Sequence, residues 1–183
     1  MDELIDILDE NGNYTGKTCL KSEAHLKGLF HPTVHIWFYT LDGKILFQKR
    51  GKDKKTFPLL WDVSVAGHIG AGENRIVATI REVEEEIGLQ ILSSDLDEIG
   101  IFKSVQKHSE TLLDKEFHHT FLCELKLPIS NLSKQESEVE DLALIQLTDF
   151  KSKVYHGRLD DFVPHSTSYY RKIISELEKR TTL

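Results

Sequence analysis

Four glutamates crowd one short segment of the sequence, and three of them fall at the spacing that one face of a helix requires. In "REVEEEIGL" (residues 81–89), Glu82, Glu85 and Glu86 stand at positions i, i+3 and i+4. Like charges at this spacing repel one another, so a bound cation would relieve the crowding. Because hard divalent cations prefer oxygen ligands, we expect these glutamates to bind Mg²⁺ or Mn²⁺. Taken alone, the segment would also suit a solvated acidic helix.

A helix over residues 74–87 would hold these carboxylates in place. Its apolar residues recur at helical spacing and form one stripe: Ile76, Ile80, Val83 and Ile87. Gly88 is a typical stop signal. At about 100° per residue the three glutamates lie roughly opposite the stripe, so the stripe can seat the helix on a sheet while the carboxylates face a cleft. Glu84 points elsewhere on the helix.

The wider spacing resembles one known family. Gly67, five residues, Glu73, seven residues and then "REVEEEIGL" are similar to the complete Nudix box of the Nudix hydrolases, over residues 67–89. The resemblance implies metal-dependent cleavage of a diphosphate linkage in a small molecule, such as a nucleoside diphosphate derivative. It makes Glu82, Glu85 and Glu86 the metal ligands. It also pairs Glu73 with Arg81, which would brace the loop against the helix.

A narrower resemblance covers roughly residues 20–150. "SEAHLKGLFHPTVHIWFY", "LFQKRGKDKKTFPLLWDVSVAGH" and "DKEFHHTFLCE" are similar to the isopentenyl-diphosphate isomerases and their hydrolase relatives. In the isomerases a metal lies among three histidines and two acids. The matching positions hold His25, His31, His68, Asp114 and Glu116, with Asp114 in place of the usual glutamate. The resemblance therefore implies a second metal site, and if no metal binds there, Glu116 is a candidate general base.

Ala66 separates this chain from the isomerases, which carry a catalytic cysteine at the matching position. Alanine has no proton to donate or accept, so allylic proton transfer by that route is lost. The glutamates of the Nudix box, which isomerases often lack, are all present. Both differences favour hydrolysis over isomerisation. An active isomerase remains the first alternative, and a non-catalytic ligand-binding module with the same fold remains the second.

A basic loop, "KRGKDKK", offers cations for a diphosphate. The isomerase resemblance assigns Arg50 and Lys54 to the substrate diphosphate, and Arg50 also suits bidentate phosphate contact. Lys52 and Lys55 are equally well explained as solvated residues. Four aromatic residues could stack a base or bury a prenyl tail, and they are at least as well explained as core: Trp37, Phe38, Phe57 and Trp61.

Short strands and helices alternate irregularly around these motifs. β-rich runs precede and follow an Asp-Gly turn at residues 42–43, and further strands are predicted within residues 97–106, 116–125 and 141–147. Residues 21–29 and 148–155 fit short helices, and a serine or threonine cap opens a C-terminal helix at about residues 166–180. This pattern favours an α+β protein of the Nudix fold, a mixed β-sheet sandwiched between helices. We expect a single domain over residues 1–183, with an N-terminal β extension over residues 1–30.

Composition limits the partners. The formal net charge of −7 argues against a nucleic acid polymer, and no stretch is long and apolar enough to suggest a membrane. Two cysteines without a shared motif fit a cytoplasmic protein with free thiols. We therefore expect a small-molecule diphosphate as the partner, with homodimerisation left open.

Overall fold

The computed structural model describes residues 2–110 and 112–182. Four helices and nine strands are seen in this part of the chain, together with two short 3₁₀ turns. In chain order they are β1 (Leu4–Leu8), β2 (Tyr14–Leu20), α1 (Lys21–Lys27), β3 (His31–Tyr39), β4 (Lys44–Arg50), β5 (Trp61–Asp62), β6 (Val65–His68), α2 (Arg75–Ile87), β7 (Asp97–Ser109), β8 (Leu112–Glu124), β9 (Val139–Gln146), α3 (Leu147–Tyr155) and α4 (Thr167–Glu178).

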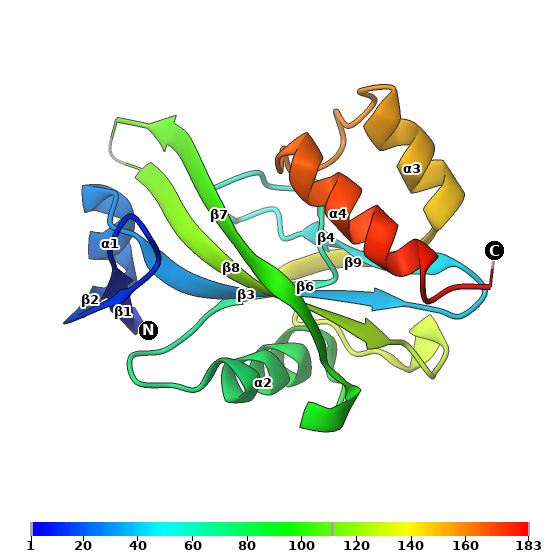
Figure 1. The fold of residues 1–183 in the computed structure, drawn as a ribbon, viewed down its shortest axis with the longest axis horizontal. Helices are drawn as coiled ribbons and strands as arrows, with labels where there is room; N and C mark the ends of the chain where they lie inside the picture. The colour runs from blue at the N-terminus through cyan, green and yellow to red at the C-terminus, as the bar shows by residue number, and fades with distance from the viewer. Residues whose placement is uncertain (1, 111, 183) are drawn as a thin grey trace.

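A mixed sheet of seven strands forms the middle layer of the molecule. Its main path runs β5–β4–β3–β8–β7, while β6 also pairs with β3 and β9 pairs with β4. β3 and β8 are parallel, and every other pair in the sheet is antiparallel. Helix α2 lies on one face, and α3 and α4 lie on the other (Figure 1). The predicted α+β architecture, a mixed sheet between helices, is therefore confirmed.

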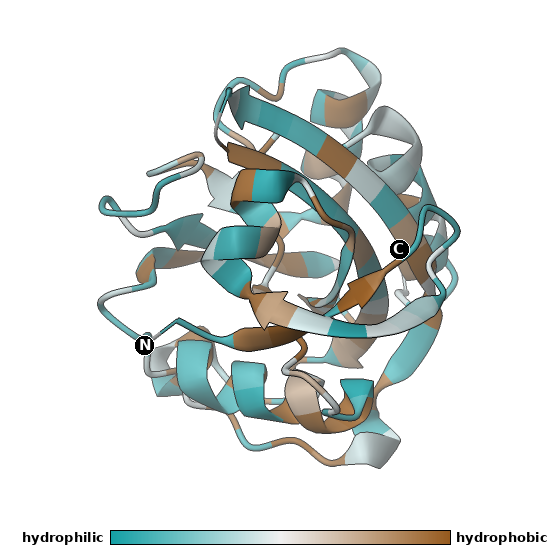
Figure 2. Ribbon diagram, turned by 90° about the vertical axis from the view of Figure 1, so that its left-hand side faces the viewer, coloured by the Kyte–Doolittle hydropathy of each residue, from teal (hydrophilic) through white to brown (hydrophobic). Residues whose placement is uncertain are grey.

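Each face of the sheet has its own hydrophobic core. On the side of α3 and α4, Trp37 and Phe47 pack with Phe150 and Tyr170. On the side of α2, the core is built from aliphatic residues of β3 and α2 together with Phe38 and Phe121. Figure 2 shows the hydrophobic residues concentrated on the strands in the middle of the molecule, whereas the peripheral loops are mostly hydrophilic. Trp37 and Phe38 are fully buried, so these two aromatic residues belong to the core and not to a ligand site.

The N-terminal segment packs against one end of the sheet. β1 and β2 form an antiparallel hairpin, with α1 following directly (Figure 1). Ile5 of β1 is fully buried with Ala24 of α1, and the Leu8 amide donates to the Phe30 carbonyl at 2.7 Å. Helix α1 ends at Gly28, whose left-handed backbone (φ 60°) disfavours other residues. These contacts bring His25 of α1 towards β3 and β8.

Helix α2 begins and ends where its sequence predicts, but its polar face differs from the expectation. The Asn74 side chain caps the first turn by accepting from the Ile76 amide at 2.8 Å, and Gly88 ends the helix with a left-handed backbone. Of the three predicted metal ligands, Glu82 and Glu86 are buried beside Val83, and Glu85 is exposed. The three carboxylates line one cleft, as expected, but Glu82 and Glu86 lie against β6 and are not exposed. The helix buries two adjacent surfaces, one in the core and one against β6.

Candidate active site

The close approach of α2 to β6 sets the position of the first carboxylate. Gly67 lies on β6, opposite Val34 of β3. A Cβ atom built on Gly67 would lie 2.0 Å from Cδ of Glu82, a distance that no real side chain tolerates. Glycine is therefore required here so that the Glu82 carboxylate can lie directly against the strand.

Arg81 braces this arrangement from the loop side. Its Nε and Nη2 atoms donate to the two carboxylate oxygens of Glu73, both at 3.0 Å, and Nη2 also donates to the His68 carbonyl at 3.0 Å. Nη1 donates to Glu82 at 2.7 Å and to Glu85 at 3.3 Å, so these two carboxylates converge on one nitrogen. The Glu73–Arg81 pair anticipated from the sequence is present, and it fixes the loop that carries Gly70 to the helix.

Glu86 is the most deeply enclosed of the three glutamates. Its Oε2 atom accepts from Nε2 of Gln48 at 3.0 Å and from the Ala66 amide at 3.3 Å. Burial, and then the neighbouring charge of Glu82, raise the pKa of Glu86 to about 7. Burial also raises the pKa of Glu82, although Arg81 acts in the opposite direction. A hard divalent ion prefers carboxylate oxygens, and its charge would offset the repulsion between Glu82 and Glu86, so these residues fit such an ion.

Two basic residues line the same cleft, Arg50 at the end of β4 and Lys54 in the loop that follows it. Arg50 is held by Asp62, whose Oδ2 accepts from Nη1 at 2.8 Å, and by Thr56, whose carbonyl accepts from Nε at 3.1 Å. Lys54 forms an ion pair with Glu138 and lies in the electrostatic field of Glu86. Phe57 of this loop also lines the cleft. The loop thus places fixed positive charge across from the carboxylates of α2.

Three histidines meet beside the carboxylates, as the sequence resemblance implied. One ring nitrogen from each of His25, His31 and His68 lies within 4.8 Å of the others. Nδ1 of His31 donates to the Leu29 carbonyl at 2.9 Å, which leaves the lone pair on Nε2. Nε2 of His31 and Nε2 of His68 are buried and have no hydrogen-bond partner among the described residues. Metal–nitrogen bonds are about 2.1 Å long. Small rotations of the three rings would let their nitrogens share one ion, so the cluster fits a metal ion.

The two acids of the predicted second site differ in position. Glu116 lies at the cluster, because its Oε1 atom is 3.5 Å from Nε2 of His31 and 3.7 Å from Nε2 of His68. Asp114 lies behind it, with Oδ1 2.6 Å from Nδ1 of His25 and Oδ2 2.7 Å from Nε2 of His108. Both Asp114 oxygens are therefore engaged by imidazole rings, an arrangement that orients a ligand histidine and leaves its other nitrogen free.

Glu116 is partly buried among the imidazole rings of His31, His68 and His118. Burial by itself would raise the pKa of this carboxyl, but His31, His118 and His68 outweigh burial and hold the pKa well below its ordinary value. The carboxylate is thus ionised near neutral pH. Glu116, His68 and His118 line one cleft of 1010 Å³, together with Glu82, Glu85, Glu86, Arg50 and Lys54.

Comparison with known proteins agrees with this geometry. The model of the NUDIX domain matches residues 29–165. The chain belongs to the Nudix hydrolase family. An uncharacterised Nudix hydrolase of Clostridium acetobutylicum is 33% identical over 96% of this chain and 97% of its own length. An isopentenyl-diphosphate delta-isomerase of Serratia proteamaculans is 30% identical over 67% of this chain and 66% of its own. A crystal structure of a Deinococcus radiodurans protein shares the fold, with a TM-score of 0.65 at 14% identity over 97% of this chain and 99% of that one.

The Nudix cleft also holds polar residues that the sequence analysis did not single out. Gln48 holds Glu86, and His108 holds Asp114, as described above. Deeper on the sheet, Nδ1 of His118 bonds Thr33 Oγ1 at 2.7 Å, and Nδ1 of His35 bonds the Tyr169 hydroxyl at 2.8 Å. His165 pairs through Nε2 with Asp62 at 2.9 Å.

The sequence does carry one signal for this buried row. Polar residues occupy alternate positions of β3 (His31, Thr33, His35) and of β8 (Asp114, Glu116, His118), which places each set on one face of its strand. The parallel register joins the sets, since His31 lies opposite Glu116 and Thr33 opposite His118. The alternation in the sequence indicates which residues share a face of each strand. The pairing of β3 with β8 shows that the two faces form one surface.

Proposed function

We propose that this chain is a Mg²⁺- or Mn²⁺-dependent enzyme that hydrolyses a diphosphate linkage in a small molecule. The observation that carries the proposal is that Glu82, Glu85 and Glu86 line the same cleft as Arg50 and Lys54. The three carboxylates provide a site for a divalent metal, and the two cations provide a site for phosphate oxygens.

The protein groups have distinct roles in this proposal. Glu82, Glu85 and Glu86 hold the cation, and Arg81 with Glu73 keeps the helix and the loop in register. The guanidinium of Arg50 has five N–H donors. Asp62 and Thr56 fix its orientation and leave donors for a diphosphate oxygen. Lys54 adds a second charge next to the carboxylates. When bound, the divalent cation would neutralise diphosphate charge and lower the pKa of an attacking water.

The histidine cluster is proposed as a second metal site in the same cleft. His25, His31 and His68 supply imidazole nitrogens and Glu116 supplies an oxygen, while Asp114 orients His25. A mixed nitrogen and oxygen set favours a transition metal over Mg²⁺. If the cluster binds no metal, the ionised Glu116 carboxylate is available as a general base.

The proposal is tested by incubating the purified chain with a panel of diphosphate compounds in Mg²⁺ or Mn²⁺. The panel should include nucleoside diphosphates and triphosphates, nucleotide sugars and isoprenoid diphosphates. We expect release of phosphate or of a nucleoside monophosphate from at least one class, and loss of that release when the metal is chelated. Binding without turnover across the whole panel would instead support the alternative of a non-catalytic Nudix module.

We further infer a cytoplasmic location and leave open a homodimer. Both cysteines are free, and burial raises the pKa of the Cys123 thiol to about 12, so this thiol is unreactive. Among residues 2–110 and 112–182, no helix is long and apolar enough to cross a membrane.

A further inference from the structure

Asp62 is a buried carboxylate that holds two other residues of the cleft at once. It lies on β5 and lines the cleft together with Arg50 and His165. Its Oδ2 atom accepts from Nη1 of Arg50 at 2.8 Å. Its Oδ1 atom accepts from Nε2 of His165 at 2.9 Å and from the Val63 amide at 2.8 Å. Both oxygens are therefore occupied, so this carboxylate serves its neighbours and is not a free ligand.

The Asp62 carboxyl is ionised near neutral pH. Burial by itself would raise its pKa, but His165 and then Arg50 outweigh burial and hold the pKa well below its ordinary range. An ionised carboxylate can only accept hydrogen bonds, so Nε2 of His165 is the donor in this pair. His165 therefore supplies a hydrogen bond that keeps one oxygen of Asp62 engaged.

The bonds at Oδ1 limit how Asp62 can hold Arg50. Because Val63 and His165 occupy that oxygen, Arg50 contacts the carboxylate through Nη1 alone and not through a bidentate fork. Thr56 accepts two further N–H groups, with its carbonyl 3.1 Å from Nε and its hydroxyl 3.3 Å from Nη2. A guanidinium has five N–H donors. Within the described part of the chain, one donor on each terminal nitrogen of Arg50 therefore remains for phosphate oxygens.

Backbone hydrogen bonds fix the position of His165 beside β5. Residues 161–163 run along this strand, since the Trp61 amide donates to the Asp161 carbonyl at 2.8 Å and the Val163 amide donates to the Trp61 carbonyl at 2.9 Å. The His165 amide then donates to the Val163 carbonyl at 2.8 Å, and α4 begins two residues further on. The segment before α4 is thus attached to the strand that carries Asp62.

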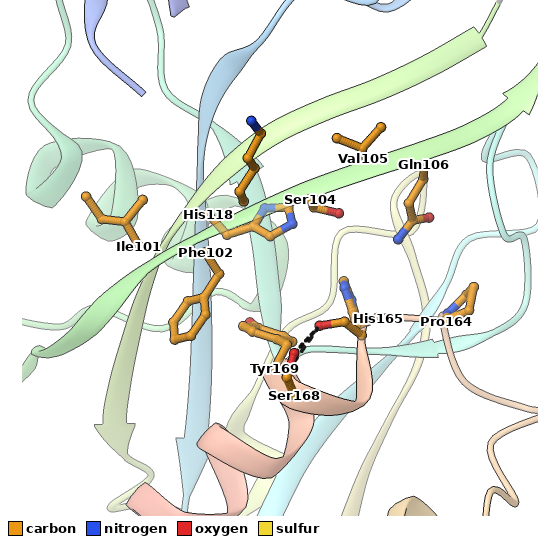
Figure 3. A pocket seen from close by; sticks show the side chains of 12 residues that line it. Ile101, Phe102, Ser104, Val105, Gln106, His118, Pro164, His165, Ser168 and Tyr169 are labelled. Carbon is orange, nitrogen blue, oxygen red and sulfur yellow. Dashed lines mark hydrogen bonds between the residues drawn. The ribbon is translucent and has the colours of Figure 1, made fainter. Parts of the chain in front are cut away.

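The His165 ring is enclosed by other aromatic rings. Only 8% of its side chain is exposed. Figure 3 shows His165 and Tyr169 together at the N-terminal end of α4, close to His118 of β8. The centre of the His165 ring lies 5.3 Å from those of Tyr169 and His35, and 6.1 Å from that of His118. This packing restricts rotation of the ring, so Nε2 stays directed at Asp62.

We propose that His165 is a positioning residue of the diphosphate site, which orients Arg50 through Asp62. The inference rests on the proposed diphosphate hydrolysis, and it adds the segment before α4 to the parts of the chain on which substrate binding depends. Without the hydrogen bond from His165, Asp62 can accept a second N–H group of Arg50 and withdraw it from the substrate. His165 acts through these two residues and needs no contact with the diphosphate.

The test measures the binding of methylene diphosphonate, a diphosphate analogue that is not hydrolysed, to the full chain by calorimetry in Mg²⁺. His165→Gln keeps an amide nitrogen near the position of Nε2, whereas the shorter side chain of His165→Asn does not reach Asp62. We expect nearly parental affinity in His165→Gln. Binding should be at least about fivefold weaker in His165→Asn, because an arginine that is not held must be ordered on binding. Equal affinities of the parent and His165→Asn would overturn the inference.

His156→Asn is the matched control, because His156 is an exposed histidine at the end of α3. It should bind methylene diphosphonate like the parent. A loss in His156→Asn as large as that in His165→Asn would show that the effect is not specific to the site, and would also overturn the inference.

Double substitutions distinguish positioning from a general effect on the fold. In the Arg50→Gln background, His165→Asn should weaken binding by less than about twofold, since the side chain that it orients is gone. Asp62→Asn is a second variant, which removes the carboxylate that links the two residues, and it should weaken binding as His165→Asn does. A full additional loss in the Arg50→Gln background, or parental binding by Asp62→Asn, would contradict the positioning role.

Turnover of the diphosphate panel by the parent is measured separately in Mg²⁺. Weaker binding by His165→Asn, without turnover of any diphosphate by the parent, would refute the proposed hydrolysis and uphold the positioning role. Turnover by the parent, with equal binding by the parent and His165→Asn, would refute the positioning role and uphold the hydrolysis. The two proposals therefore fail in different ways.

Discussion

At the scale of single residues, two small side chains decide what the cleft can do. Ala66 and Gly67 are adjacent on β6, where the carboxylates of α2 meet the sheet. Gly67 makes room for Glu82, and the Ala66 amide donates to Glu86. The absence of a side chain at one position, and of an ionisable side chain at the other, matters as much for the chemistry as the glutamates themselves.

Ala66 gives the first prediction, that the chain does not interconvert isopentenyl and dimethylallyl diphosphates at a useful rate. The methyl group cannot donate or accept a proton, so no group at this position can carry the allylic proton transfer. Incubation in heavy water with either diphosphate, followed by mass spectrometry, measures the exchange. Clear deuterium incorporation at the allylic positions by the unmodified chain would show that another residue performs the isomerase reaction.

Gly67 gives the second prediction. In Gly67→Ala the new methyl group collides with the Glu82 carboxylate, which must move away from the strand and from its hydrogen bond with Arg81. We expect metal-dependent turnover to fall by at least about 10-fold, with a loss of about 1–3 kcal/mol in the free energy of unfolding. Activity and urea unfolding are measured on the same preparation. Unchanged values of both would mean that Glu82 does not need to lie against β6.

At the scale of elements, α4 carries a clamp that ties it to the edge of the sheet. Glu176 accepts from the ammonium groups of Lys172 and Lys179, both at 2.7 Å, and from Nη1 of Arg180 at 2.8 Å. Arg180 in turn donates through Nε to Asp97 of β7 at 2.9 Å. The clamp therefore ties the C-terminal end of α4 to the start of β7.

The third prediction is that Glu176→Gln lowers the free energy of unfolding by about 1–2 kcal/mol at pH 7, with the cations' partial exposure limiting the effect. Hydrogen bonds from Lys172, Lys179 and Arg180 lower the pKa of Glu176 to about 2. This pKa is lower in the folded protein than in the unfolded chain, where it is about 4.3, so the ionised carboxylate stabilises the fold above that pH. The contribution is lost as the pH falls towards 2. The difference between parent and variant should therefore shrink below pH 4.3.

Urea unfolding at several pH values between 7 and 3 measures this difference. Glu178→Gln is the control on the same helix, because Glu178 is 40% exposed and, among the residues that the structure describes, pairs with Lys151 alone. It should change stability by less than about 0.5 kcal/mol. A loss in Glu176→Gln no greater than that of the control, or one independent of pH, would contradict the clamp.

Element boundaries could be predicted well where local signals set them. Helix α2 begins after the Asn74 cap and ends at Gly88, as expected, and α4 begins after the Ser166 cap. The lateral placement of Glu82 and Glu86 could not be predicted, because it depends on β6 packing beside the helix as well as beneath it. The position of Asp114 behind His25 depends in the same way on the register of β8 with its neighbours and on the docking of α1.

At the scale of the whole molecule, the sheet brings together side chains from segments that are far apart in the sequence. The histidine cluster joins α1, β3 and β6, and the parallel β3–β8 pair adds Glu116. Residue matching could nominate the five positions of the predicted second site: His25, His31, His68, Asp114 and Glu116. It could not reveal that His118 and Gln106 lie next to them, since that contact needs the order of the strands.

The fourth prediction concerns this cluster. The chain should bind a transition metal such as Zn²⁺ or Mn²⁺ there, independently of the carboxylate site. Equilibrium dialysis should show that His25→Ala lowers the number of bound ions by one, whereas His156→Ala, at the exposed end of α3, leaves it unchanged. Binding should weaken as the pH falls through about 6.5, because protonated imidazole is no ligand. Identical metal content in the parent and in His25→Ala would show that the histidine cluster binds no metal ion.

The most direct test of metal-dependent diphosphate hydrolysis compares two neighbouring glutamates of α2. Glu85 faces the cleft and shares Arg81 with Glu82, whereas Glu84 is exposed and its carboxylate accepts from Gln90. Phosphate or nucleotide release is measured for the parent, Glu85→Gln and Glu84→Gln at limiting Mg²⁺ or Mn²⁺. We predict that the rate of release falls by at least about 100-fold in Glu85→Gln, with the fold retained, and stays nearly parental in Glu84→Gln. Near-normal turnover by Glu85→Gln at limiting metal would contradict it.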